Sequence, residues 1–237
     1  MKYRPFLLFI IFVSCLHPAC RQKTAPSPQP ATKDSTPGSR PVRNIRDFSQ
    51  NNTNQPPFEI IRIAINADTV PDYFVVENAG LSLGSFYDGI TGNEIPVDGV
   101  NSIWSRPGVE LEYRIIDVDC GDDRKELLVR YGGGGTGGAY YTARIYRYDD
   151  SLKEVKMIFE ETISDFGWGN NGEMISGPVN YIDVNYTKDS CIHTISVIKG
   201  KFIHGEKTFS PDIIPDKKSK PQLYRFSRTA DLFERVP

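Results

Sequence analysis

Histidine is scarce in this chain, with three residues among 237. His193 lies in an alternating strand pattern and His204 precedes a glycine, so we expect structural roles for both. The sequence contains neither a His-Glu-x-x-His nor a Cys-x-x-Cys motif. Glu160 and Glu161 are adjacent in a predicted strand, so their carboxylates should point to opposite faces. We therefore expect the protein not to be an enzyme.

Long apolar runs are absent after the N-terminus. The basic start at Lys2 and Arg4 is followed by the apolar run Phe6–Ser14. This run is shorter than the ~20 apolar residues that a membrane span needs, and it is typical of a signal peptide. We predict a lipoprotein signal peptide over residues 1–19.

The few cysteines carry two predictions, of which the first is a membrane anchor. Cys20 follows Ala19 and precedes polar sequence, a context typical of a bacterial lipobox, and Cys15 after Ser14 is the alternative. The other interpretation is ordinary cleavage after Ala19. A lipidated cysteine would hold the protein on a lipid bilayer of the cell envelope, at the periplasmic face or the outer-membrane surface.

The second cysteine prediction concerns Cys120 and Cys191. In an exported protein this pair forms either a disulfide or two buried thiols, and the sequence leaves both open.

Residues 20–57 are rich in Pro, Ser, Thr, Gln and Asn and poor in large apolar side chains. Such a stretch cannot bury enough surface to offset its ordering entropy, so we predict a disordered tether. Residues 58–237 have the length of one domain. The chain holds 28 basic and 30 acidic residues with no basic patch between aromatics, which argues against nucleic acid as a partner.

Short runs of β-branched and aromatic residues, separated by turn signals, predict an all-β domain. The runs cover 58–66, 72–79, 111–119, 125–131, 139–149, 152–163, 179–187, 191–203 and 222–228. In 141–148 the odd and even positions separate, which indicates a strand with one face in the core. Residues 229–236 fit a short helix or a strand. We predict an antiparallel β-sandwich, with part of a β-propeller as the alternative.

An acidic stretch from Asp117 to Glu126 resembles in part the calcium loop D-x-D-x-D-G-x-x-[DE]. Calcium prefers 6–8 oxygen ligands, and the candidate ligands are Asp117, Asp119, Asp122, Asp123 and Glu126. Cys120 is one residue too many for this spacing, so the loop either bulges there or has lost its ion. The other interpretation is a solvated acidic turn, neutralised by Arg124 and Lys125.

Six glycines surround Thr136 in the next stretch, 132–138. A Walker loop needs Gly-Lys-[Ser/Thr] and a following helix, whereas a strand pattern follows here, so we exclude nucleotide binding. A hairpin tip and a functional loop that exposes its backbone remain as interpretations.

The stretch 111–149 resembles the central hairpin of bacterial periplasmic lysozyme inhibitors of the i-type class, and its acidic part is similar to FG-GAP-type repeats. The inhibitors are β-sandwiches that plug a glycosidase cleft with a Ser-Gly-rich segment ending in tyrosine. The resemblance implies that Gly135, Thr136, Gly137 and Gly138 act as backbone donors, with Tyr140 or Tyr141 as an anchor. Thr136 stands where the inhibitors usually carry serine.

We expect a tethered, non-enzymatic binding or inhibitor module directed at a cell-wall glycoside hydrolase, with the glycine and acidic loops together at one end of the sandwich. Trp168, in a glycine-rich stretch, would stack on a sugar or a partner, or else anchor its own loop. The alternatives are a calcium-dependent adhesion or glycan-binding module and an envelope scaffold without a small ligand.

Overall fold

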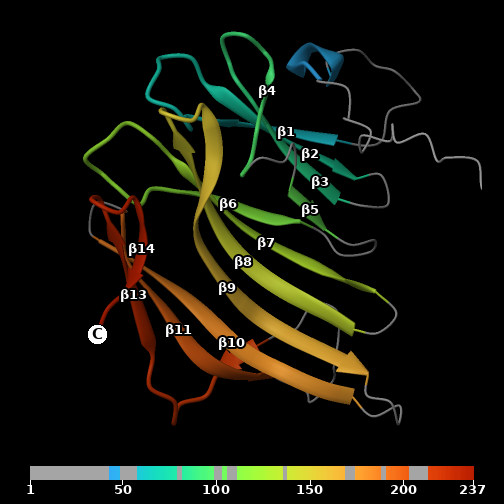
Figure 1. The fold of residues 1–237 in the computed structure, drawn as a ribbon, viewed down its shortest axis with the longest axis vertical. Coiled ribbons are helices and arrows are strands. Elements are labelled where there is room, and N and C mark those ends of the chain that lie inside the picture. Colours follow the sequence, from blue (N-terminus) through green and yellow to red (C-terminus); the bar gives the residue numbers. More distant parts are fainter. Residues whose placement is uncertain are drawn as a thin grey trace, which may run out of the picture. The chain divides into compact units, whose positions relative to one another are not determined.

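The computed structural model describes residues 43–48, 58–78, 82–98, 103–105, 111–135, 138–168, 174–187, 191–202 and 213–237. Over these ranges the chain is almost entirely β-structure, and its one helix is the short 3-10 element η1 (Ile45–Phe48). Residues 41–237 form one compact unit with two antiparallel sheets (Figure 1). The prediction of an all-β, sandwich-like antiparallel fold is confirmed. In the described ranges no helix has the length and apolar character to cross a bilayer.

A five-stranded sheet comes first in the chain. Its strands are β1 (Phe58–Ile63), β2 (Asp72–Asn78), β3 (Ser82–Tyr87), β4 (Glu94–Ile95) and β5 (Ile103–Ser105). Their order is β1-β2-β3-β4, and β5 also pairs with β3. Strand β3 was not predicted from the sequence, because its serine and glycine residues interrupt the strand pattern. Gly84 is needed there, since a Cβ would lie 2.5 Å from Cζ of Phe74 on the neighbouring strand.

The segment 43–48 packs onto this sheet. Arg43 forms an ion pair with Glu77, and Asn44 forms an isolated bridge with Asn93. The Phe48 ring is buried between Phe58 and Tyr87, with ring centroids 5.3 and 5.5 Å away. The prediction that the tether extends to residue 57 is therefore wrong for residues 43–48. The buried Phe48 ring attaches this otherwise polar segment to the five-stranded sheet. The signal peptide and Cys15 and Cys20 lie outside the described residues.

A nine-stranded sheet makes up the rest of the unit. Its strands are β6 (Glu112–Ile116), β7 (Glu126–Gly135), β8 (Gly138–Asp149), β9 (Glu154–Trp168), β10 (Met174–Tyr186), β11 (Ile192–Phe202), β12 (Ile213–Pro215), β13 (Gln222–Ser227) and β14 (Leu232–Arg235). The order is β14-β13-β11-β10-β9-β8-β7-β6, and β12 pairs with β11. The ambiguous segment 229–236 contributes a strand, β14.

Alternate residues of the central strands enter two different cores. On β7 and β8, Leu127, Val129 and Tyr146 pack against the five-stranded sheet, in a first core. Leu128 and Ile145 face the other way, into a second core with residues of β10, β11 and β14. The expected separation of the two faces is confirmed, but both faces are buried instead of one.

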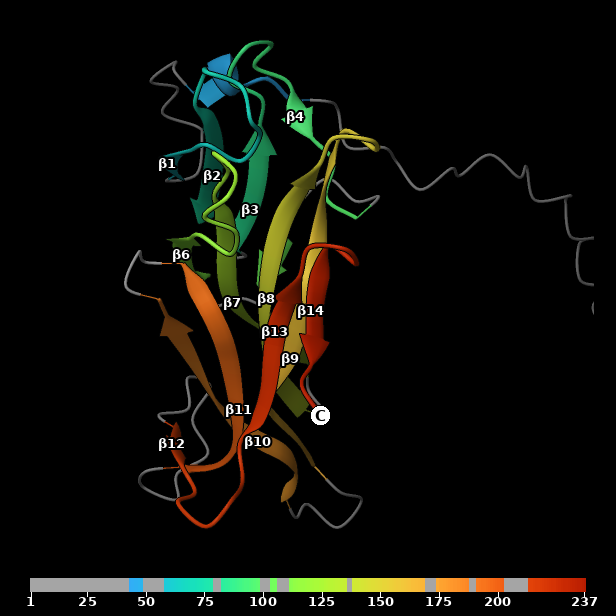
Figure 2. The same cartoon turned by 90° about the vertical axis from the view of Figure 1, so that its left-hand side faces the viewer.

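The second core exists because the large sheet curls over itself (Figures 1 and 2). At the start of β11, the amide of Ile192 donates to the carbonyl of Asp117, which follows β6, at 2.7 Å. Strands from the two halves of one sheet therefore face each other across a shared interior.

Candidate functional site

The acidic loop between β6 and β7 is a network of ion pairs. Asp117 pairs with Lys125, and Asp119 pairs with Arg228. Asp122 accepts a hydrogen bond of 2.6 Å from Arg147. Asp123 is exposed and takes part in no ion pair within the described part of the chain. The loop thus resembles the neutralised turn that was the alternative to a calcium loop, with more distant basic partners than expected.

Arg147 on β8 is the centre of this network. Its side chain is 8% exposed and contacts Glu126 at 2.5 Å, Asp122 at 2.6 Å and Asp231 at 3.1 Å, while its guanidinium lies 5.1 Å from the Phe226 ring centroid. One cation therefore connects β7 and β8 with the loop before β7 and the turn before β14.

Glu126 is fully buried beneath this arginine. One carboxylate oxygen accepts the amide hydrogen of Val118 at 2.8 Å, and the other accepts from Arg147. Burial raises the pKa of Glu126 to about 7, although the Val118 amide and Arg147 both act to lower it. Glu126 was predicted as the closing calcium ligand, but in the structure it is an internal partner of Arg147.

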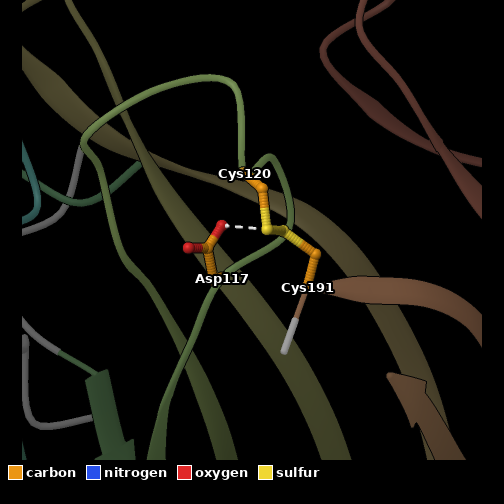
Figure 3. Close-up of side chains that lie close together, drawn as sticks. All are labelled: Asp117, Cys120 and Cys191. Carbon is orange, nitrogen blue, oxygen red and sulfur yellow. Dashed lines mark hydrogen bonds between the residues drawn. A yellow bond between two sulfur atoms is a disulfide. The ribbon is translucent and has the colours of Figure 1, made fainter. Parts of the chain in front are cut away.

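The predicted calcium ligands do not converge. Groups of three or more potential ligand atoms lying within 4.8 Å of one another occur twice in the described ranges, and neither group contains more than one of the five predicted residues. The first group joins Asp117 with Cys120 and Cys191. The two cysteines form a disulfide, with Cα atoms 5.8 Å apart, so they offer no thiolate. Asp117 Oδ1 lies 3.5 Å from Cys191 Sγ (Figure 3).

The second group, Asp68, Asp72 and Asp88, lies beside the five-stranded sheet and was missed by sequence analysis. Asp72 is fully buried, and it accepts hydrogen bonds from the amide of Gly89 at 2.9 Å and from Asn66. Burial raises the pKa of Asp72. Asp88 accepts the Thr91 amide hydrogen at 2.6 Å. These oxygens already support the turns around them.

The glycine stretch is mostly strand. Residues Gly132 to Gly135 are the last four of β7 and pair in register with Tyr141, Tyr140, Ala139 and Gly138 of β8. The Tyr140 ring crosses Gly133, where a Cβ would lie 2.1 Å from the ring's Cζ. Tyr141 is 8% exposed, so it does not present its ring to a partner. Thr136 and Gly137 lie outside the described residues.

The acidic and glycine loops lie at opposite ends of β7. The acidic loop leads into Glu126 and the glycine tip follows Gly135, ten residues later. At ~3.3 Å per residue the two ends are about 30 Å apart. The prediction of one working surface formed by both loops is therefore wrong, because the intervening strand continues through the glycines.

The structure instead brings the glycine hairpin together with the β9–β10 hairpin. Gly135, Gly138 and Gly167 are in register on β7, β8 and β9, so three neighbouring strands carry no side chain at one level. Trp168 is the next residue after Gly167, and its backbone pairs with Met174 of β10. Figure 1 shows the β7–β8 and β9–β10 hairpins running side by side to the same end of the sheet.

The carboxylates at the middle of β9 serve structural roles. Glu160 pairs with Arg144 at 2.5 Å, and Glu161 accepts from Asn180 at 3.1 Å, so the two point to opposite faces as predicted. A Gly-x-Ser-x-Gly pattern, the motif of a nucleophile elbow, spans residues 80–84 and was not among the predicted sites. Its Ser82 begins β3 of a hairpin and donates to Asn78 at 2.8 Å, so it is not on the strand–turn–helix that an acyl-transfer serine needs.

The candidate surface is thus the end of the sheet where the two hairpins finish, which we call the twin-hairpin end: Gly135, Gly138, Tyr140, Gly167 and Trp168. Comparison of the chain with protein-family models, with curated proteins and with solved structures found no match.

Proposed function

We propose that this protein is a non-enzymatic binding module of the cell envelope, anchored through lipidated Cys20 (or Cys15), that inhibits a cell-wall glycoside hydrolase through its twin-hairpin end. The observation that carries the proposal is the register of Gly135, Gly138 and Gly167. Because these three adjacent strands each carry glycine at the same level, no side chain there keeps a partner from the backbone. The resemblance to i-type lysozyme inhibitors supplies the class of partner.

The Cys120–Cys191 disulfide supports an extracytoplasmic location, because such bonds persist in oxidising compartments. The ion pairs of the acidic loop give less support to the calcium-dependent adhesion module, since a cation at that loop would have to displace Lys125, Arg147 and Arg228. A scaffold without a ligand is the outcome if no partner binds the twin-hairpin end.

The test uses one substitution at each end of β8. Gly138→Glu places a carboxylate in the glycine row, where it should repel the acidic cleft of a lysozyme. Leu152→Glu makes a comparable change in the exposed turn at the opposite end, where Leu152 is 62% exposed. We expect wild type and Leu152→Glu to inhibit an i-type lysozyme equally and Gly138→Glu to inhibit it at least about tenfold more weakly, a loss of about 1.4 kcal/mol.

Circular dichroism and melting curves establish that both variants keep the fold. The proposal is wrong if the wild type inhibits no cell-wall hydrolase, or if Gly138→Glu, correctly folded, inhibits as well as the wild type does.

A further inference from the structure

A cavity of about 270 Å³ opens on the inner face of the curled sheet, between β6 and β7 on one side and β10 on the other. Arg130 precedes the glycines on β7, but none of the residues that line the cavity was predicted above as a site residue. Its apolar wall consists of Leu128, Ile182 and Val184, all of which contribute to the second core or pack against it. Two arginines, Arg114 of β6 and Arg130 of β7, also line it.

Arg130 stands apart from the other arginines of the protein. Among the arginines that the structure describes, the buried or half-buried ones are Arg43, Arg124, Arg130, Arg144 and Arg147. Every one of these except Arg130 holds an acidic partner. The Nε atom of Arg130 is buried and has no hydrogen-bond partner. A half-buried guanidinium that forms no ion pair is costly, so this group is suited to an anion from outside the chain.

Arg114 lies on the same face of the sheet, close to Arg130. In the pairing of β6 with β7, Arg114 is opposite Leu128 and Glu112 is opposite Arg130, which makes the two arginines diagonal neighbours. Diagonal neighbours in a sheet lie within reach of long side chains. The guanidinium of Arg114 is 5.0 Å from the centroid of the Tyr186 ring, which orients it, and it forms no ion pair within the described ranges.

The acidic residues near the cavity do not neutralise these arginines. Glu112 is exposed and forms no ion pair with Arg130, although it stands directly opposite in the register. Asp183 of β10 also lines the cavity; it is exposed and forms no ion pair within the described ranges. Two guanidinium groups therefore line a recess with apolar walls, together with two exposed carboxylates that form an ion pair with neither arginine.

We propose that this recess, the Arg114–Arg130 site, binds a small ligand through an oxyanion, either a carboxylate or a phosphate. The planar guanidinium group matches both oxyanions with two parallel hydrogen bonds. The volume is below the ~300–1,000 Å³ of sites for drug-sized ligands, which favours a small metabolite or the terminal group of a larger one. The proposal is independent of the twin-hairpin end.

The site is tested with inorganic phosphate and acetate as probes, each titrated against sodium chloride of the same ionic strength. Binding is followed by the ¹H–¹⁵N signals of the arginine Nε–H groups and by the melting temperature. We expect the Arg130 Nε–H signal to shift in a saturable manner with at least one probe and not with chloride. The probe that binds more tightly identifies the oxyanion.

Arg130→Met and Arg114→Met keep much of the side-chain length and remove the charge. Because a hydrogen bond to a charged group contributes about 1.5–3 kcal/mol, we expect each to weaken binding at least about tenfold. Arg62→Met, at an exposed position on β1, is the matched control and should bind as the wild type does. The melting-temperature shift of Arg62→Met also allows correction for the general stabilisation that phosphate gives to many proteins.

The proposal is overturned if the Arg130 signal of the wild type responds no differently to phosphate, acetate and chloride. It is also overturned if folded Arg130→Met is stabilised by the probes as much as Arg62→Met is. The wild-type signal decides the question even where Arg130→Met fails to fold.

Discussion

At the scale of single residues, Arg147 accounts for two acidic residues of the 117–126 stretch, Asp122 and Glu126. Alternation along β8 places Arg147 on the same face as Ala143 and Ile145, which lie in the second core, and its side chain is 8% exposed. Asp122, Glu126 and Asp231 gather around its guanidinium. Removing one partner of a buried ion pair typically costs ~3–5 kcal/mol, whereas an exposed pair contributes ~0–1 kcal/mol. Clustered carboxylates in a sequence can therefore form ion pairs with a distant arginine, as Asp122 and Glu126 do here.

Glu126 should make the stability depend on pH. Its pKa is raised from the ordinary 4.5 to about 7, first because of burial. Between these two values the folded protein holds a proton that the unfolded chain has released, so the free energy of unfolding falls as the pH rises. The expected fall is about 3 kcal/mol, since a difference of one in pKa corresponds to about 1.4 kcal/mol.

Urea denaturation of wild type and Glu126→Gln at several pH values between about 4.5 and 7 measures this. We expect the wild type to lose about 3 kcal/mol relative to the variant across the window, because glutamine does not titrate. A difference that stays constant with pH would mean that Arg147 keeps Glu126 ionised throughout.

At the scale of elements, the sequence predicts strands well and their ends poorly. Alternation in 139–149 predicts β8 nearly to the residue. The glycines of 132–135 suggest a loop, because glycine disfavours strands, and yet they continue β7. They are extended because they pair with residues 138–141 of β8, and the Tyr140 ring over Gly133 leaves no room there for a Cβ. No periodicity in the sequence reveals this register. For the same reason the row of Gly135, Gly138 and Gly167 could not be predicted, although each residue is visible in the sequence.

The contact between Gly133 and Tyr140 can be measured by a double-mutant cycle. Gly133→Ala should destabilise the protein by about 1–3 kcal/mol, because the new methyl group would displace the tyrosine ring. In a Tyr140→Ala background the same change should be neutral or stabilising by up to ~1 kcal/mol, since alanine orders more cheaply than glycine. Urea denaturation of the four proteins gives the coupling energy. Equal effects of Gly133→Ala in both backgrounds would show that the ring does not determine the need for glycine.

At the scale of the whole molecule, the folded unit is a sandwich of one small sheet on one curled sheet. The curl brings the loop after β6 to the start of β11, residues that are far apart in sequence. Two links fasten them: the Cys120–Cys191 disulfide, with a sequence separation of 71, and the hydrogen bond from Ile192 to Asp117. From the sequence, a disulfide between the two cysteines was one of two alternatives. Which strands the disulfide brings together could not be predicted, because that depends on the curvature of the sheet.

Removing the disulfide tests how far the curl depends on it. In the chain-entropy model, a bond that closes a loop of this length contributes about 4 kcal/mol. We expect the double variant Cys120→Ser, Cys191→Ser to lose stability by about this amount, and the Ile192 amide to exchange its hydrogen faster than amides at the centre of β8. Wild-type protein with the disulfide oxidised or reduced provides the matched comparison without a change of sequence.

If the variant unfolds at the same urea concentration as the wild type and the Ile192 amide stays protected from exchange, the second core alone holds the sheet curled. A loss of about 4 kcal/mol would instead be a large part of the ~5–15 kcal/mol that keeps a domain folded, so this chain would need an oxidising compartment in order to fold fully.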